Sequence, residues 1–247
     1  MDLGLQGKAA IVCGASSGLG LAIAESLRSE GANVVMSARR EDVLAREADR
    51  LGAVPATLDL RDPDAPAALV TRCVEAFGGV DVLVWNGGGP KTGLAADVTV
   101  DALRESYELL VFPLVRLVRM ALPHLERSGA GRILAVSSTG VREPTPHIAL
   151  SNAVRPGMHG YLKTLANELA PKAITVNLVA AGRLDTSRMA QIFPNGVPPE
   201  QLKEIPMGRW GRPQEFGDVV CFLASSRASY ITGSTINVDG GLVRGAF

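Results

Sequence analysis

The fold of this chain is decided by the stretch Val12-Cys13-Gly14-Ala15-Ser16-Ser17-Gly18-Leu19-Gly20. An apolar run before it, Ala9–Val12, predicts a buried strand, and the run after it, Leu21–Leu27, predicts a helix. The three glycines between them let the backbone come close to a bulky group. The helix start offers unpaired N–H groups and a positive dipole end, which favour a phosphate. A tight turn without a ligand is the alternative, and the strand–turn–helix context argues against it.

The length, composition and net charge of the chain argue against several classes of function. With 247 residues, 47% of them hydrophobic, the chain has ample apolar residues for a sizeable core. The formal net charge of +0 argues against binding to nucleic acid or to an anionic membrane surface. Apolar runs such as Leu109–Val115 are far shorter than the ~20 residues that span a bilayer. Because the first strand starts near the N-terminus, we expect no signal peptide.

The three cysteines, Cys13, Cys73 and Cys221, are far apart and include no Cys-x-x-Cys pair. This usage fits a reducing cytoplasm and argues against a disulfide framework or a cysteine-rich metal site. Three scattered histidines without clustered carboxylates argue against a catalytic metal.

Strand-like and helix-like runs alternate along the whole chain. We expect strands at Ala9–Val12, Asn33–Ser37, Ala53–Leu58, Val80–Trp85, Arg132–Val136, Ile174–Val179 and Thr235–Val238. We expect helices over 40–50, 66–77, 98–127, 152–170 and 213–225, and a loop or lid over 183–212. Continuous apolar strands in a βαβ rhythm predict a single α/β domain, residues 1–247, with a doubly wound parallel sheet covered by helices on both faces.

Ligands of such sheets lie beyond the carboxyl ends of the strands. After the second strand the chain reads Ser37-Ala38-Arg39-Arg40, where an acid would hold the ribose hydroxyls of NAD(H). A guanidinium at Arg39 instead favours the 2′-phosphate of NADP(H), with two solvated arginines as the alternative. Asp59, after the third strand, is expected to accept a hydrogen bond from adenine or simply to cap the strand. The glycines after Asn86 let a nucleotide pass close to the backbone, unless they form an ordinary loop.

With these segments in place, the chain resembles the short-chain dehydrogenase/reductase family, in particular its 3-oxoacyl-acyl-carrier-protein reductases. The motifs that carry the resemblance span the chain: Gly14-x-x-x-Gly18-x-Gly20, Asp59, Asn86-Gly87-Gly88, Gly131 to Ser138, Val176-Asn177, Gly182 to Thr186 and Ile231 to Gly241. The resemblance implies a Rossmann fold and a nicotinamide cofactor, with Thr186 near the carboxamide. The cofactor residues it implies are Gly14, Ser16, Ser17, Gly18, Leu19, Gly20, Arg39, Asp59, Leu60, Asn86, Gly87, Gly88, Arg155, Gly182 and Thr186. It also implies a homotetramer or a homodimer.

The catalytic residues depart from the family. Its members usually act through an Asn, a Ser, a Tyr and a Lys, in which the Tyr passes a proton to the substrate carbonyl. Ser138 matches the serine, whereas Ser151 and Arg155 stand at the Tyr-x-x-x-Lys positions and Leu110 stands at the asparagine position. The residues four places after Tyr107, Tyr161 and Tyr230 are Val111, Leu165 and Ser234, so no register restores the motif.

The substitutions change the expected chemistry. An alkyl hydroxyl is far less acidic than a phenol, and Leu110 cannot hold a relay water. Arg155 keeps a positive charge and several donors but cannot relay a proton. His147 and His159 are possible replacement donors, with a solvated loop residue and a packing residue as the respective alternatives.

Three functions follow from these observations. The first is an NADP(H)-dependent oxidoreductase that acts on a small carbonyl or alcohol through Ser138, Ser151 and Arg155. The second is a non-catalytic NADP(H)-binding protein or sensor, indicated by the loss of Tyr, Lys and Asn together. The third is a lyase or dehydratase in the same pocket, without net redox change. The region 183–212, with Arg183, Arg188, Met189 and Phe193, selects no particular substrate.

Overall fold

The computed structural model describes residues 1–187, 189 and 199–245. Its centre is a seven-stranded sheet in the order β3-β2-β1-β4-β5-β6-β7, and every pair of neighbouring strands is parallel. The strands are β1 (Ala9–Cys13), β2 (Asn33–Ala38), β3 (Val54–Thr57), β4 (Val82–Trp85), β5 (Arg132–Ser138), β6 (Thr175–Ala181) and β7 (Thr235–Val238). This is the doubly wound sheet that the sequence predicts, and that prediction is confirmed.

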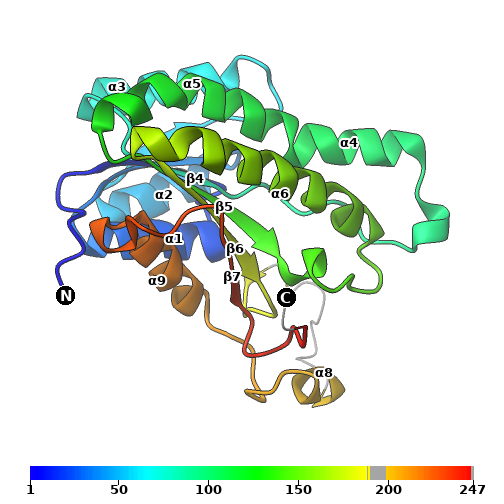
Figure 1. The fold of residues 1–247 in the computed structure, drawn as a ribbon. Helices are drawn as coiled ribbons and strands as arrows, with labels where there is room; N and C mark the ends of the chain where they lie inside the picture. The colour runs from blue at the N-terminus through cyan, green and yellow to red at the C-terminus, as the bar shows by residue number, and fades with distance from the viewer. Residues whose placement is uncertain (188, 190–198, 246–247) are drawn as a thin grey trace.

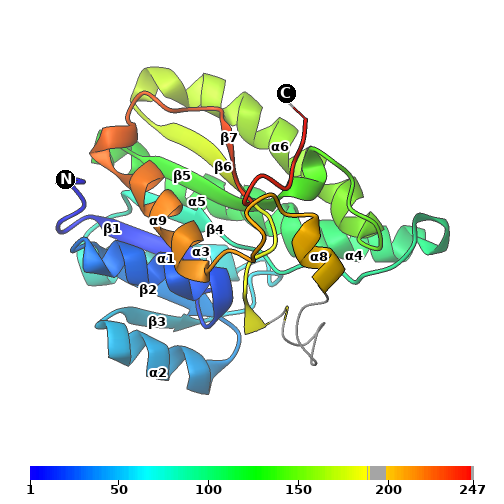
Figure 2. The same ribbon diagram turned by 90° about the horizontal axis from the view of Figure 1, so that it is seen from below.

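Helices cover both faces of the sheet (Figures 1 and 2). The described α-helices are α1 (Gly18–Ser29), α2 (Glu41–Leu51), α3 (Ala65–Phe77), α4 (Val100–Leu110), α5 (Phe112–Ser128), α6 (Ala149–Leu169), α8 (Pro199–Lys203) and α9 (Pro213–Ala224). One face is packed by α3, α5 and α6 and the other by α1, α2 and α9 (Figure 1). No helix among these described residues is long and apolar enough to cross a membrane.

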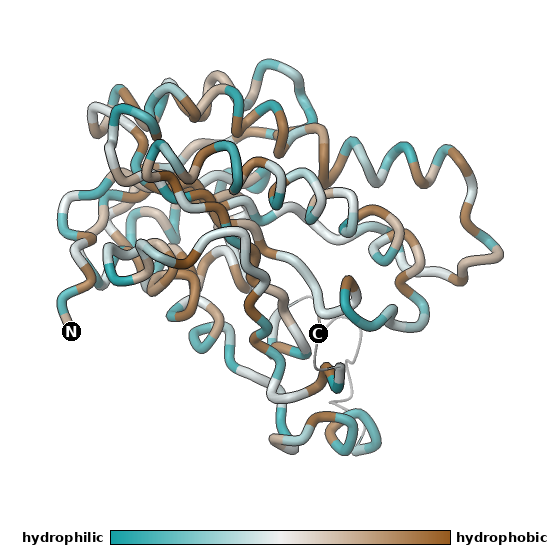
Figure 3. The backbone as a smooth tube through the Cα atoms, viewed as in Figure 1, coloured by the Kyte–Doolittle hydropathy of each residue, from teal (hydrophilic) through white to brown (hydrophobic). Residues whose placement is uncertain are grey.

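Two apolar cores result, one on each side of the sheet. Along β1, Ile11 belongs to the core under α3, α5 and α6, whereas Val12 belongs to the core under α1 and α9. Both are fully buried, because strand side chains alternate between the two faces. The brown, apolar segments of the tube gather accordingly along the central strands (Figure 3). This arrangement explains why the strands read as continuous apolar runs.

The helix expected over 98–127 is in fact two helices. α4 ends at Leu110, and α5 starts at Phe112 with Pro113 in its first turn. Proline has no N–H to donate to the preceding turn and its ring clashes with that turn, so it ends one helix and starts another. The expected loop over 183–212 also contains a short helix, α8, among its described residues.

The order of the strands shows at which edge of the sheet a ligand is expected to bind. The chain starts at β1 in the middle, runs outward to β2 and β3, and then crosses back to β4. The carboxyl ends of β1 and β4 therefore flank the point where the direction of winding reverses, which is where doubly wound sheets bind ligands. β5 and β6 are longer than the sequence suggests and end together, with Ser138 paired to Ala181.

Candidate functional site

The glycine turn after β1 is closely packed. Gly14 and Gly18 have φ angles of +62° and +58°, a region that favours glycine. A Cβ at Gly20 would lie 2.2 Å from the carbonyl oxygen of Gly14, and a Cβ at Gly14 would lie 2.6 Å from that of Asn86. The turn can therefore hold its shape only with glycine at these positions.

The loops after β1 and β4 meet at the switch point. Asn86 Nδ2 donates a 3.3 Å hydrogen bond to the carbonyl oxygen of Gly14. Both residues were predicted from sequence to hold the cofactor, and the structure brings them into direct contact. The interaction ties the glycine turn to the start of the Asn86-Gly87-Gly88 segment.

The start of α1 is open to an anion. Ser17 precedes the helix in an extended conformation and makes no side-chain capping hydrogen bond, and the first turn contains no acidic residue. The first turn-closing bond along the chain is the one from Leu21 N to Ser17 O. The N–H groups of Gly18, Leu19 and Gly20 therefore lie at the positive end of the helix dipole.

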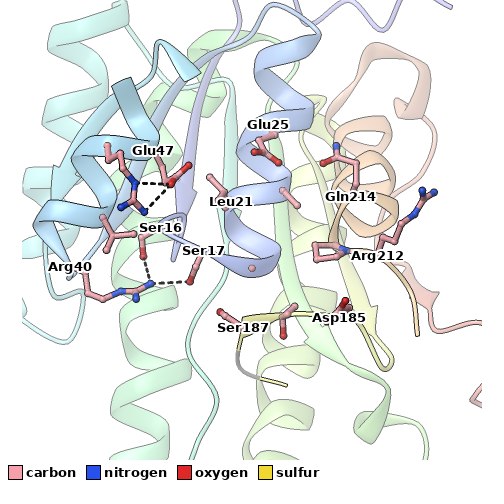
Figure 4. Close-up of a pocket in the computed structure, with 16 residues that line it drawn as sticks. Ser16, Ser17, Leu21, Glu25, Arg40, Glu47, Asp185, Ser187, Arg212 and Gln214 are labelled. Carbon is pink, nitrogen blue, oxygen red and sulfur yellow. Dashed lines mark hydrogen bonds and ion pairs between the residues drawn. The ribbon is translucent and has the colours of Figure 1, made fainter. Parts of the chain in front are cut away.

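Arg40 adds a cation to this turn. Its Nη2 donates to the hydroxyls of Ser16, at 3.3 Å, and Ser17, at 3.0 Å (Figure 4). Within residues 1–187, 189 and 199–245, no carboxylate lies within ion-pair distance of Arg40. Sequence reasoning favoured Arg39 for the 2′-phosphate, but the choice between these adjacent arginines depends on side-chain direction, which only the structure shows.

A groove of about 630 Å³ begins at this turn and runs along the outer side of α1 (Figure 4). Arg40 and Glu47 line it on the side of α2, and Arg212 and Gln214 line it on the side of α9 (Figure 4). Thr186 and Ser187 line it as well. Thr186 lies over the glycine turn, because a Cβ at Gly18 would be 3.7 Å from the Thr186 side chain. The loop after β6 is thus near the turn, and the expected place of Thr186 near the carboxamide stays a prediction.

The loop after β3 is held by an ion pair. Arg61 donates from Nε to both carboxylate oxygens of Asp59, at 3.0 and 3.1 Å. These hydrogen bonds, aided by the charge of Arg39, hold the pKa of Asp59 below its usual value. Leu60 packs at the edge of the core under α3 and α5. The proposed contact of Asp59 with adenine stays a prediction.

Gly182 allows a close approach of two strand ends. A Cβ at Gly182 would lie 2.6 Å from the Cα of Asp239. The N–H of Gly182 donates a 3.0 Å hydrogen bond to the carbonyl oxygen of Val238. Gly182 thereby fixes where the chain leaves β6 toward Thr186.

The predicted catalytic residues lie on β5 and α6. Arg155 Nε donates a 3.0 Å hydrogen bond to Ser151 Oγ, and its Nη1 donates 3.2 Å to the carbonyl oxygen of Val136. Ser151 and Arg155 are each 9% exposed. Ser138, two residues after Val136, ends β5 and accepts a 3.2 Å hydrogen bond from the N–H of Gly140. The structure therefore joins Ser151 and Arg155 directly and places both beside the strand that carries Ser138.

An apolar cluster surrounds Leu110, the residue expected from the sequence to stand at the family's asparagine position. Leu110 is 1% exposed, and a Cβ at Gly87 would lie 3.0 Å from its Cδ2 and 2.9 Å from the ring of Trp85. Gly87 is therefore required by packing around Leu110 and Trp85. Gly88, the next residue, lies near Leu109, whose Cδ1 would be 3.7 Å from a Cβ there.

His159 makes contacts that the sequence did not reveal. Its Nε2 lies 2.6 Å from Ser137 Oγ and its Nδ1 lies 3.5 Å from Thr235 Oγ1. Burial, and then the positive charges of Arg155 and Arg142, lower the pKa of His159 to about 4. The sequence places His159 one turn beyond Arg155 on the same helix. It does not predict the contacts of His159, because Ser137 and Thr235 belong to two other elements.

The other candidate donor, His147, is exposed in the loop before α6 and has a φ of +63°. Its carbonyl oxygen accepts a 2.8 Å hydrogen bond from the N–H of Gly93. The described contacts do not bring the His147 ring to Ser151. Arg188 and Phe193, named with the substrate loop, lie outside the described residues.

The residues at the sheet edge fit a phosphorylated dinucleotide. Because Gly18 has no Cβ, no side chain covers the start of the helix there. Arg40 supplies a cation that has no carboxylate partner among the described residues. Backbone N–H groups, two serine hydroxyls and a guanidinium form a donor set suited to phosphate oxygens. The chemistry of this site agrees with the expectation of NADP(H).

Comparisons with known proteins agree with this geometry. A family model described as enoyl-(acyl carrier protein) reductase matches residues 14–243. The 3-oxoacyl-(acyl-carrier-protein) reductase FabG of Vibrio cholerae is 34% identical over 242 residues, which cover 97% of this chain and 99% of that protein. The uncharacterized oxidoreductase YmfI of Bacillus subtilis is 36% identical over 241 residues, 95% of this chain and 98% of that protein.

Two solved structures superpose over nearly the whole chain. L-sorbose reductase of Gluconobacter frateurii, complexed with NADPH and L-sorbose, has a TM-score of 0.93 at 30% identity and covers 99% of this chain and 100% of its own. An NADPH-bound short-chain oxidoreductase of Pseudomonas aeruginosa containing an atypical catalytic center has a TM-score of 0.92 at 33% identity, with 98% and 100% covered. The chain therefore belongs to the short-chain dehydrogenase/reductase family.

Proposed function

We propose that this chain is an NADP(H)-dependent oxidoreductase that acts on a carbonyl or alcohol substrate through Ser138, Ser151 and Arg155. The observation that carries the proposal is the hydrogen bond from Arg155 Nε to Ser151 Oγ, beside the strand that ends in Ser138. The relatives with NADPH in their structures and the reductases among the similar sequences support it.

The cofactor would be held at the edge of the sheet. The turn from Gly14 to Gly20 and the hydroxyls of Ser16 and Ser17 would bind phosphate oxygens, with Arg40 or Arg39 at the 2′-phosphate. Thr186 would lie toward the nicotinamide end and Asp59 toward the adenine end. When bound, NADPH supplies the hydride that reduces a carbonyl carbon.

Ser138, Ser151 and Arg155 would stabilise the negative charge that develops on the substrate oxygen. Ser138 Oγ accepts from Gly140 N–H, and Ser151 Oγ accepts from Arg155, so each serine can still donate its own hydroxyl proton. The guanidinium of Arg155 stays protonated and adds positive charge beside Ser151. Fixed donors aimed at a developing negative charge are typically the largest contribution to such catalysis.

Arg155 cannot relay protons as a lysine can, and Ser151 is less acidic than a tyrosine. Losing general acid catalysis typically costs a factor of about 100 to 10,000. We therefore expect slow turnover of simple ketones and faster turnover only of substrates whose carbonyl is already activated, such as 3-oxoacyl esters, α-hydroxyketones or quinones.

The second candidate is a non-catalytic NADP(H)-binding protein. The buried contact of Leu110 with Gly87 and Trp85 favours it, because this apolar cluster fills the place of the relay asparagine. A lyase or dehydratase is the third candidate and would use the same serines.

The test is a titration of the protein with NADPH and NADH by fluorescence, followed by absorbance measurements with a panel of ketoesters, ketoses and quinones. Preferred NADPH binding with oxidation of NADPH by at least one acceptor supports the first candidate. Tight NADPH binding without turnover of any acceptor supports the second. Product analysis without NADPH detects the elimination of water that the third would catalyse.

A further inference from the structure

A polar contact lies behind the catalytic residues, between α6 and the sheet. His159 Nε2 and Ser137 Oγ are 2.6 Å apart, and Ser137 is only 3% exposed. The neighbours of His159 along the helix, Met158 and Leu162, are fully buried in the apolar core. His159 itself is half-buried, and the short hydrogen bond satisfies the buried hydroxyl of Ser137, which would be costly to leave unpaired.

The hydrogen bonds fix the protonation of the ring. Among the described residues, His159 Nε2 is the acceptor available to the buried hydroxyl of Ser137, so we assign the Ser137 O–H as the donor. The proton of the neutral ring is then on Nδ1, which faces Thr235 Oγ1 at 3.5 Å. Arg155 on α6 and Arg142 in the loop after β5 are the charged groups that disfavour a protonated ring.

Ser137 and His159 are not arranged as a nucleophile and base. Ser137 is buried, and the third member of the group is the hydroxyl of Thr235 rather than a carboxylate. With Ser137 only 3% exposed, its hydroxyl offers almost no surface to a substrate. The contact must therefore act on its neighbours in the fold.

Those neighbours include one of the proposed catalytic residues, Ser138, and the backbone partner of another, Arg155. Val136, whose carbonyl oxygen accepts from Arg155, and Ser138 flank Ser137 directly along β5. Helix α6 is thus connected to the end of β5 at two successive turns, by Arg155 at Val136 and by His159 at Ser137. Added to the apolar packing of α6, two directional contacts constrain its rotation and its position along the strand more tightly than one does.

We propose that His159 is a positioning residue that, through Ser137, fixes the end of β5 against α6 and keeps Arg155 on Ser151. The proposed role needs no contact of His159 with substrate or cofactor. The proposal rests on the function proposed above for Ser151 and Arg155, and it adds the residue that sets their geometry. An error of about 1 Å in such a geometry can cost about a hundredfold in rate.

The first readout is independent of turnover. The Arg155 Nε–H gives a nitrogen–proton NMR signal that Arg155→Lys identifies by its loss. In the wild-type protein the hydrogen bond to buried Ser151 should protect this signal from exchange with water. In His159→Leu we expect exchange at least about tenfold faster. His159→Gln, whose amide can accept from Ser137, should restore part of the protection.

The second readout is kinetic. His159→Leu should lower kcat about tenfold or more on the best acceptor and leave KM nearly unchanged, and His159→Gln should recover part of the loss. His124→Leu is the matched control, because His124 contacts Arg127 on α5, away from these residues. If His159→Leu fails to fold, Ser137→Ala breaks the same hydrogen bond from the strand and should change both readouts in the same direction.

Unchanged Arg155 exchange and unchanged kcat in His159→Leu, with only a lower unfolding midpoint, would overturn the proposal and leave a packing role. If the wild-type protein turns over no acceptor, the proposed function fails, but the exchange measurement still decides whether His159 positions Arg155. The two failures are therefore distinguishable.

Discussion

Arg155 Nε donates a 3.0 Å hydrogen bond to the Oγ of Ser151, one turn earlier on α6. Both side chains are 9% exposed, so a permanent cation is held against a hydroxyl with little water between them. A buried cation strengthens the ability of a neighbouring hydroxyl to donate, because it stabilises negative charge on the oxygen. The proposed function requires this pair to polarise a substrate carbonyl although it lacks the acidity of a phenol.

Ser151→Ala tests this pair directly. We expect kcat on the best acceptor to fall about 100-fold, the typical effect of removing one donor to a developing oxyanion. NADPH affinity should change little, because the Arg155 side chain keeps its bond to Val136. Steady-state kinetics and NADPH fluorescence measure the two effects. Thr164→Ala, which removes an exposed hydroxyl from the same helix, is the control. Equal rates in Ser151→Ala and the wild-type protein would remove Ser151 from the mechanism.

Arg40→Ala and Arg39→Ala decide which arginine recognises the 2′-phosphate. Arg40 contacts the two serines of the glycine turn, whereas the charge of Arg39 acts on Asp59. We expect Arg40→Ala to weaken NADPH binding about 10- to 100-fold, the equivalent of one or two charge-assisted hydrogen bonds, and NADH binding less than about twofold. Dissociation constants for both nucleotides give the answer. A larger selective loss in Arg39→Ala would return the role to the residue that the sequence favoured.

Gly20→Ala tests whether the turn needs its close packing. The added Cβ would lie 2.2 Å from the carbonyl oxygen of Gly14, so the backbone must move. We expect NADPH affinity to fall at least about tenfold, because the N–H groups at the helix start lose their arrangement. Gly160→Ala on α6 is the matched control, since its Cβ meets nothing within 4 Å and should stabilise the helix by roughly 0.5–1 kcal/mol. Normal NADPH binding by Gly20→Ala would show that the turn tolerates the shift.

The sequence predicts the sheet well and the side-chain geometry poorly, for physical reasons. Strands buried on both faces read as continuous apolar runs, and glycine turns mark the carboxyl ends, so the ligand edge follows from pattern alone. The break at Val111 is hidden, because apolar residues run through 109–115 without interruption. Only Pro113 signals it, and prolines are also tolerated within the first turn of a helix.

Contacts between distant elements could not be predicted. The hydrogen bond of Arg155 with Ser151 follows from their spacing on one helix, whereas the contact of His159 with Ser137 joins residues 22 positions apart in different elements. The choice between Arg39 and Arg40 depends on which one points toward the turn, and a pattern of residues carries no such direction. The homotetramer expected from the family resemblance stays a prediction.

The pKa of His159 predicts a pH dependence of stability. Burial and the charges of Arg155 and Arg142 lower this pKa from its usual 6.5 to about 4 in the folded protein. Between these two pH values the unfolded chain binds a proton at this residue that the folded protein does not, so the contribution of His159 to the free energy of unfolding falls as the pH falls through this window. The contribution of His159 is thus fully present above about pH 6.5 and is lost progressively toward pH 4.

His159→Gln removes this titration, and all other groups stay the same in both proteins. We therefore expect the stability difference between the wild-type protein and His159→Gln to shrink, or to change sign, as the pH is lowered from 6.5 to 4. Urea unfolding followed by circular dichroism at several pH values measures this difference. A constant difference across the window would mean that His159 takes up its proton equally in both states. Burial and the charges of Arg155 and Arg142 would then not determine when the ring takes up its proton.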